Sequence, residues 1–172
     1  DMADYFLVFA WTDLDKKKAR DHSGLSAFIV EKEWEGVSTA TIHGKLGVRA
    51  GNTGSIAFQD VKVPIENLVY REGQGFKIAM FCLDQGRYTV AGGSCGLIRA
   101  CRDACVNYAK DRHTFTNPIA DHQLVKQMIA NMEAGYEYSS YLWMKAGWLK
   151  NQSKRSTRAT SLAKCIACRE AE

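Results

Sequence analysis

The segment Arg112-His-Thr-Phe-Thr-Asn-Pro118 combines several side chains that could hold an anionic ligand. It places a fixed cation, hydroxyl groups and an aromatic ring in the gap between two long helical patterns. A guanidinium matches the geometry of a phosphate, and a connector projects its donors beyond the helix ends. Two interpretations remain open at this point: a phosphate-binding loop, or a helix connector with an exposed arginine.

Cysteine offers a second kind of chemistry, because Cys165-x-x-Cys168 has the spacing of half a zinc or redox site. Cys95, Cys101 and Cys105 do not supply a matching second pair, so we expect no metal site. We expect Cys101 and Cys105 on the packed face of a helix, where cysteine acts as a small apolar residue. Six cysteines without a secretory signal favour reduced thiols in a reducing compartment.

The cluster Gly92-Gly-Ser-Cys-Gly96 lies inside a helical pattern and follows no strand, which argues against a phosphate cradle. A glycine within a helix costs about 1 kcal/mol relative to alanine. The cluster therefore predicts that something, either chain or ligand, approaches the helix backbone closely.

The composition is typical of a globular protein, with 46% hydrophobic and 24% charged residues in 172. The net charge of +4 is too small to indicate nucleic-acid binding, and we expect the basic run Lys150 to Arg158 to be a solvated linker. Apolar stretches such as Tyr5 to Trp11 are far shorter than the roughly 20 residues of a membrane-spanning helix. No membrane span is expected. The four histidines show no metal-ligand spacing.

The spacing of apolar residues differs between the first seventy residues and the rest of the chain, which predicts two structural units. Segments rich in β-branched and aromatic residues predict strands over 5–11, 25–30, 37–42 and 55–58, and the charged segment 13–18 between them is predicted to be a loop. Pro64 ends the last extended segment, and glycines 73 and 75 mark a connector. This part predicts an antiparallel sheet or barrel.

The rest of the chain has helical spacing. The first predicted helix runs from Phe76 to about Asp111, with an apolar stripe at Ala79, Leu83, Val90, Leu97, Cys101, Ala104 and Tyr108. The second carries a stripe at Leu124, Met128, Met132, Gly135, Ser139, Leu142, Ala146 and Leu149. A third begins near Thr157, and its pattern still continues at Glu172.

We therefore predict an α+β fold, with residues 1–70 as part of a β-domain and residues 71–172 as part of a four-helix bundle of long antiparallel helices. These helices carry apolar stripes that 172 residues cannot fully cover, and the chain opens without an initiator methionine. We expect further sequence at both ends.

Six segments in this order resemble the flavin-dependent acyl-CoA dehydrogenases, and together they span most of the chain. They are Gly44-Lys-Leu-Gly-Val-Arg-Ala-Gly-Asn-Thr53, Phe58-Gln-Asp-Val-Lys-Val-Pro-Ile-Glu-Asn-Leu68, Gly73-Gln-Gly-Phe76, Leu83-Asp-Gln-Gly-Arg87, Tyr108-Ala-Lys-Asp-Arg-His-Thr-Phe115 and Pro118-Ile-Ala-Asp-His-Gln123. The resemblance implies the second half of the family's middle β-domain and the first half of its C-terminal helical domain.

The reaction that this resemblance implies is the α,β-desaturation of an acyl-CoA thioester. A glutamate removes the α-proton while the β-hydrogen leaves as hydride to the N5 atom of FAD. Electrons then pass to an electron-transfer flavoprotein. The protein supplies the base, a dry pocket and hydrogen bonds to the thioester carbonyl.

The resemblance also implies roles for particular residues. Asp84 and Arg87 match positions at the substrate CoA site. Arg112, Thr114 and Phe115 match the connector that touches the FAD of a neighbouring subunit, with His122 and Gln123 close behind, which implies a homodimer or homotetramer. An FAD pyrophosphate would give the Arg112 guanidinium an anionic partner and favours the ligand-binding interpretation of that segment.

One position departs from part of the family. The isovaleryl and long-chain branches carry their glutamate base immediately before the helix arginine, where this chain has Gly86. The resemblance is therefore to the short-chain, medium-chain and glutaryl-type branches, whose base lies further along, past Glu172. We assign no catalytic residue in this chain, and we expect the 172 residues alone to be inactive.

The leading hypothesis is an acyl-CoA dehydrogenase for a short or cyclic acyl group, located in a bacterial or archaeal cytoplasm or in the mitochondrial matrix. Three alternatives remain open. They are an acyl-CoA oxidase or flavin monooxygenase of the same fold, a non-catalytic scaffold or binding module that has lost its base, and a redox or zinc protein that uses Cys165 and Cys168.

Overall fold

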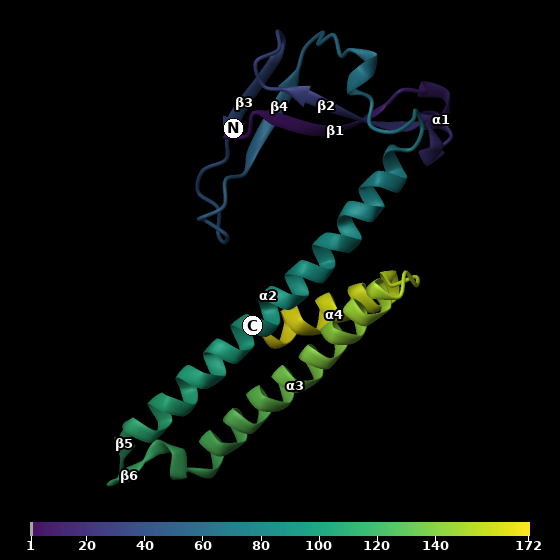
Figure 1. Cartoon of the computed structure of the whole chain (residues 1–172). Coiled ribbons are helices and arrows are strands. Elements are labelled where there is room, and N and C mark those ends of the chain that lie inside the picture. Colours follow the sequence, from purple (N-terminus) through teal and green to yellow (C-terminus); the bar gives the residue numbers. More distant parts are fainter. Residues whose placement is uncertain (1) are drawn as a thin grey trace. The chain divides into compact units, whose positions relative to one another are not determined.

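The computed structural model describes residues 2–172 and divides into two compact units, residues up to Met80 and residues from Phe81 onward. The elements are β1 (Tyr5–Trp11), α1 (Leu14–Lys18), β2 (Leu25–Glu31), β3 (Val37–Thr41), β4 (Gly54–Phe58), α2 (Gly75–Asp111), β5 (His113–Thr114), β6 (Asn117–Pro118), α3 (Gln123–Asn151) and α4 (Thr157–Glu170) (Figure 1). Short 3₁₀ turns lie at His22–Gly24, Ile65–Asn67 and Ile119–Asp121. The domain boundary expected between residues 70 and 71 stays a prediction, since α2 runs through the division between the units.

The first unit is built from antiparallel strand pairs, as the sequence predicts. β1 pairs with β2 from Tyr5 opposite Glu31 to Trp11 opposite Leu25, and β3 pairs with β4. The described residues form separate two-stranded sheets and no closed barrel. The buried apolar side chains of this unit, Ala27 and Val30, lie on β2.

The prediction of a loop over residues 13–18 is wrong, because these residues include the short helix α1. The Asp13 side chain accepts hydrogen bonds from the backbone N–H groups of Asp15 and Lys16, at 3.1 and 3.0 Å. This N-cap satisfies two donors that an exposed helix end would otherwise leave to water. Local side-chain capping, rather than an apolar stripe, forms α1.

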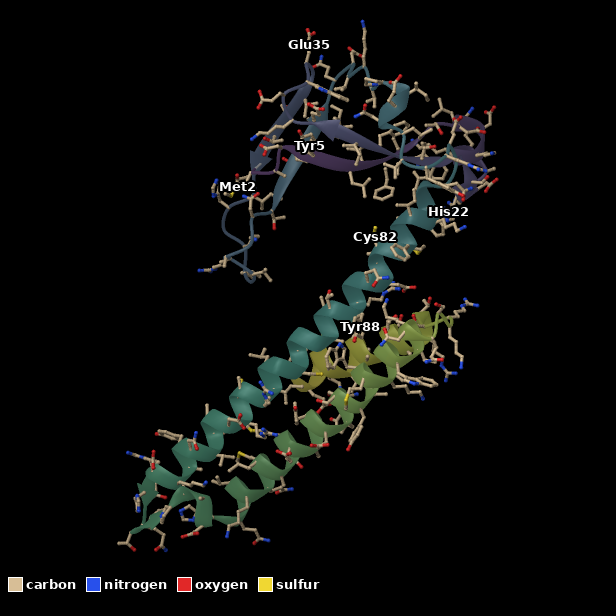
Figure 2. All side chains as sticks on the ribbon, viewed as in Figure 1. Met2, Tyr5, His22, Glu35, Cys82 and Tyr88 are labelled. Carbon is tan, nitrogen blue, oxygen red and sulfur yellow. The ribbon has the colours of Figure 1, made fainter. Side chains whose placement is uncertain are left out.

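The second unit consists of long antiparallel helices packed through small side chains. Its core contains Ala91 and Cys95 of α2, Ala146 of α3, and Ala163 and Ala167 of α4. Small residues let helix backbones approach closely, and larger rings pack at the margin of this core. Tyr88 of α2, labelled in Figure 2, lies in this unit. Its ring stacks on that of Trp143 of α3, with the ring centroids 5.6 Å apart.

The face of α2 that packs differs from the predicted stripe. Leu83, Val90, Leu97 and Tyr108 are about half exposed, at 49, 48, 52 and 62%. Cys101, expected on the packed face, is also exposed, so that expectation is wrong. The buried residues of α2 are instead Ile98 and three small residues, Ala91, Cys95 and Ala109.

Close approach to the glycine cluster is confirmed at one position. A Cβ atom at Gly92 would lie 3.0 Å from the indole nitrogen of Trp143, whereas at Gly93 and Gly96 it would meet no atom of the chain within 4 Å. On α3, the predicted stripe is confirmed at Gly135, Ser139 and Ala146, which are buried. The stripe is wrong at Leu124 and Met128, which are 69 and 57% exposed.

None of the helices in the described part of the chain combines the length and apolar character that a membrane span requires.

Candidate functional site

The segment that joins α2 to α3 folds as a small hairpin. β5 pairs with β6, with His113 opposite Pro118 and Thr114 opposite Asn117. The Arg112 carbonyl accepts a hydrogen bond of 2.8 Å from the Ile119 N–H, and its own N–H donates to the Tyr108 carbonyl at 2.9 Å. The backbone of Arg112 is therefore fixed between the last turn of α2 and the far side of the hairpin.

The hairpin brings together three of the predicted cofactor residues. The Thr114 hydroxyl lies 2.9 Å from Nε2 of His122, and the ring of Phe115 contacts the His122 ring edge-on at 6.4 Å. Phe115 has a backbone φ of +51° and is 89% exposed. Left-handed backbone is uncommon for an aromatic residue and persists where surrounding structure holds it. The hairpin therefore presents the Phe115 ring to solvent.

Arg112 and Gln123 border this group without joining it. Both side chains are exposed, and neither forms a hydrogen bond or ion pair with another described residue. An exposed guanidinium without an internal partner keeps all its donors for a ligand. The predicted segment therefore has an anion-binding group at Arg112 and a flat apolar ring at Phe115. It has no described carboxylate paired with the guanidinium.

A second group of polar side chains lies on α2 near the start of α4. Nη1 of Arg87 donates to Oδ1 of Asp84 at 2.8 Å, and the two residues are one helical turn apart. The Thr157 hydroxyl donates to Oδ2 of the same carboxylate at 2.7 Å. Arg87 and Asp84 are partly exposed, at 36 and 22% of their side-chain surface. The structure thus pairs the two predicted substrate residues.

Thr157 was not among the residues that the sequence analysis assigned to a site. Its partner Asp84 lies 73 residues away, so no local spacing could have connected them. The one available signal was its place at the predicted start of the third helix, which α4 confirms.

The two groups lie far apart, one on α2 and the other just beyond its C-terminal end. From Arg87 to Arg112 the chain advances 25 residues, and at 1.5 Å per residue this corresponds to about 38 Å. One small ligand cannot touch both arginines of a single chain.

The thiols show no comparable site. Among residues 2–172, no group of three or more His, Cys, Asp or Glu side chains is placed to hold a metal, and all six cysteines are free. Cys165 is exposed, while Cys168 lies 3.3 Å from the Ser94 hydroxyl. Burial raises the pKa of the Cys95 thiol, which makes it a poor nucleophile at neutral pH.

An antiparallel β unit followed by long antiparallel helices, with arginines presented on a helix and at a helix connector, defines an α+β protein with a helical-bundle domain. The family described as "Acyl-CoA dehydrogenase, C-terminal domain" matches residues 73–172. The chain belongs to the acyl-CoA dehydrogenase family.

Individual relatives resemble nearly the whole chain. The mitochondrial short-chain specific acyl-CoA dehydrogenase of Rattus norvegicus is 37% identical over 161 residues, which are 94% of this chain and 38% of that protein. The solved structure of butyryl-CoA dehydrogenase from Megasphaera elsdenii superposes with a TM-score of 0.90 at 36% identity, covering 98% of this chain and 43% of that one.

A solved structure described as an electron transferring flavoprotein of Acidaminococcus fermentans contains a chain 39% identical to this one, with a TM-score of 0.91. That match covers 99% of this chain and 44% of the other. This chain therefore spans about two fifths of the length of these relatives.

Proposed function

We propose that the protein to which this chain belongs catalyses the FAD-dependent α,β-dehydrogenation of an acyl-CoA thioester with a short or cyclic acyl group. The observation that carries this proposal is the 37% identity to a short-chain specific acyl-CoA dehydrogenase across 94% of the chain. The butyryl-CoA dehydrogenase relative supports a short acyl group.

The hairpin after α2 suits a flavin nucleotide. The guanidinium of Arg112, which has no partner among residues 2–172, complements a pyrophosphate, and the exposed Phe115 ring offers an apolar surface to a flat ring system. Thr114 and His122 hold the hairpin in shape through their mutual hydrogen bond. Gln123 lies at the start of α3, where its amide could complete the contacts. FAD, when bound, supplies the acceptor for the substrate hydride.

The pair of Asp84 and Arg87 suits the CoA portion of the substrate. Arg87 donates only one described hydrogen bond, through Nη1, so its other N–H groups remain for phosphate or carbonyl oxygens of CoA. Asp84 holds the guanidinium in place from one turn earlier on α2. Both residues therefore bind and orient the substrate. Gly86 between them has no side chain that could accept a proton.

The separation of about 38 Å between Arg87 and Arg112 supports assembly into a homodimer or homotetramer. In such an assembly, Arg87 binds CoA for its own subunit while Arg112 reaches the FAD of a neighbour. We propose an electron-transfer flavoprotein as the electron acceptor, supported by the Acidaminococcus match. The mitochondrial and bacterial relatives support the mitochondrial matrix or a bacterial or archaeal cytoplasm as the location.

The proposal is tested with the intact protein, purified and examined for flavin absorbance. Anaerobic addition of butyryl-CoA, isovaleryl-CoA, glutaryl-CoA or cyclohexanoyl-CoA is expected to bleach the oxidised flavin with at least one thioester. Free butyrate plus CoA is the control and is expected to leave the absorbance unchanged.

Two results would contradict the proposal. One is the absence of bound flavin or of bleaching with every thioester. The other is rapid oxygen consumption during turnover, which would identify an oxidase or monooxygenase instead.

A further inference from the structure

The carboxylate of Asp84 has a hydrogen-bond donor on each oxygen, and the two donors come from different helices. Oδ1 accepts from Nη1 of Arg87 on α2 at 2.8 Å. Oδ2 accepts from the Thr157 hydroxyl on α4 at 2.7 Å. Asp84 therefore connects a residue with a proposed substrate role to a residue with none assigned.

The position of Thr157 is itself fixed. It is the first residue of α4, and its carbonyl accepts a 3.0 Å hydrogen bond from the hydroxyl of Thr160. Thr160 is fully buried, as are Ala163 and Ala167 on the following turns of α4. The Thr157 hydroxyl is thus presented to Asp84 by the packed part of the helix.

This contact limits how Asp84 can bind Arg87. A carboxylate and a guanidinium form their strongest pair with two parallel hydrogen bonds, which use both oxygens. The hydrogen bond from Thr157 fixes the rotation of the Asp84 carboxylate, and in this orientation Asp84 accepts from Arg87 through Oδ1 alone. Arg87 is held in place, yet most of its donors stay unused and 36% of its side chain is exposed.

We propose that Thr157 is a positioning residue for substrate binding. It holds Oδ2 of Asp84, so that Arg87 keeps its remaining N–H groups for the CoA portion of the thioester. Without this hydroxyl, the Asp84 carboxylate turns to bind Arg87 through both oxygens, which takes a second N–H group from the ligand and changes the orientation of the guanidinium. This inference rests on the proposed acyl-CoA dehydrogenase function.

The test compares Thr157→Val with the wild type in the intact protein, because valine keeps the shape of threonine and replaces the hydroxyl with a methyl group, which cannot donate a hydrogen bond. Butyryl-CoA and the N-acetylcysteamine thioester of butyrate serve as substrates, the second of which lacks the nucleotide and most of the pantetheine chain. We expect Thr157→Val to raise KM for butyryl-CoA about five- to tenfold, with kcat within about twofold. The KM for the N-acetylcysteamine thioester is expected to stay unchanged.

Two further variants separate positioning from a structural role. Thr157→Ser keeps the hydroxyl and is expected to restore the KM for butyryl-CoA. Thr89→Val removes a hydroxyl that bonds only the Gly86 carbonyl of its own helix, and it is expected to behave as wild type. If thermal unfolding shows Thr157→Val to be unfolded, Thr157→Ala removes the same hydroxyl with less bulk.

The outcomes distinguish this inference from the proposed function. A wild type that turns over while Thr157→Val shows the same KM for butyryl-CoA overturns the role of Thr157 alone. The role of Thr157 is also overturned if the KM of Thr157→Val rises equally for both thioesters, or if Thr157→Ser does not restore the KM for butyryl-CoA. A wild type that binds no flavin or turns over no thioester overturns the proposed function, and the role of Thr157 with it.

Discussion

The two arginines of the candidate sites differ in what holds them. Arg87 is tied by a 2.8 Å ion pair to Asp84, whereas the Arg112 side chain has no partner among the described residues. An arginine fixed by a carboxylate is oriented before its ligand arrives, which reduces the entropy lost on binding. Within the described residues, the Arg112 side chain has no such partner to orient it, so we expect its hydrogen bonds to the ligand to contribute directly to the affinity for FAD.

We therefore expect Arg112→Gln to weaken FAD binding by about ten- to a hundredfold, because hydrogen bonds to charged groups contribute about 1.5–3 kcal/mol. The dissociation constant is measured by titrating FAD into the flavin-free intact protein and following flavin fluorescence. Arg99→Gln is the matched control, since Arg99 is an exposed arginine on α2, the helix that ends just before Arg112. Equal FAD affinity in the two variants would remove Arg112 from the cofactor site.

Glu170, near the end of α4, carries the clearest pH-dependent contact in the helical unit. Hydrogen bonding from Tyr138 of α3, and then from Arg169, lowers the pKa of Glu170 below its ordinary value of 4.5. The same contact raises the pKa of Tyr138, since deprotonation would place an anion beside Glu170. A carboxyl with a lowered pKa adds stability above its unfolded pKa and loses it as pH falls through the folded value.

Tyr138→Phe is accordingly expected to lower stability at neutral pH by about 1 kcal/mol or less, because the contact is exposed. The difference from wild type should shrink as the pH falls below 4.5, where Glu170 becomes protonated. Urea unfolding at a series of pH values measures this. Tyr141→Phe serves as control, because Tyr141 is 64% exposed on the same helix and has no described hydrogen bond. A constant difference across pH would contradict the assignment to Glu170.

At the scale of the elements, the small residues of α2 decide how closely the helices pack. Ala91 and Cys95 are buried, and Gly92 faces the indole of Trp143. The adjacent Gly93 faces open space within the chain. Replacing either glycine with alanine changes helix propensity and backbone entropy by the same amount. A comparison of the two substitutions therefore isolates the effect of packing on stability.

Gly93→Ala is expected to raise the free energy of unfolding by up to about 1 kcal/mol, since alanine favours the helix and meets no atom. Gly92→Ala gains the same propensity but places a methyl group 3.0 Å from the Trp143 nitrogen, so we expect it to be less stable than Gly93→Ala by at least about 1 kcal/mol. Thermal unfolding followed by far-UV circular dichroism measures both. Equal stabilisation by the two substitutions would show that Trp143 moves aside freely.

At the scale of the whole molecule, the chain holds two groups of residues with proposed binding roles, one for the substrate and one for the cofactor. One group lies near the start of α4 and the other at the connector between α2 and α3, about 38 Å apart along α2. Such a distance explains how one long helix could serve a substrate site and a neighbouring subunit's cofactor site at once. The half-exposed apolar residues of α2, among them Leu83, Val90 and Leu97, are available for contacts in that assembly.

Local patterns in the sequence were enough to predict most elements. The strand β1 follows from its β-branched and aromatic residues, and the long helices α2 and α3 follow from three- to four-residue spacing. The hairpin residues Arg112 to His122 are close enough in sequence to be considered together. The resemblance to the family supplied the roles of Asp84 and Arg87. Helix α1 was missed because five residues with a capping aspartate carry no apolar periodicity.

Tertiary structure alone decided which faces of the helices pack and which distant residues meet. An apolar stripe shows that a face of a helix can be buried, but it does not show which partner covers that face. On α2 the small residues Ala91 and Cys95 are buried, because they allow the helices to approach closely. The hydrogen bond from Thr157 to Asp84 joins residues 73 apart, and it exists because α3 brings the chain back to the part of α2 that carries Asp84, where α4 begins. Local spacing fixes local geometry, whereas a contact across helices depends on the packing of every element between them.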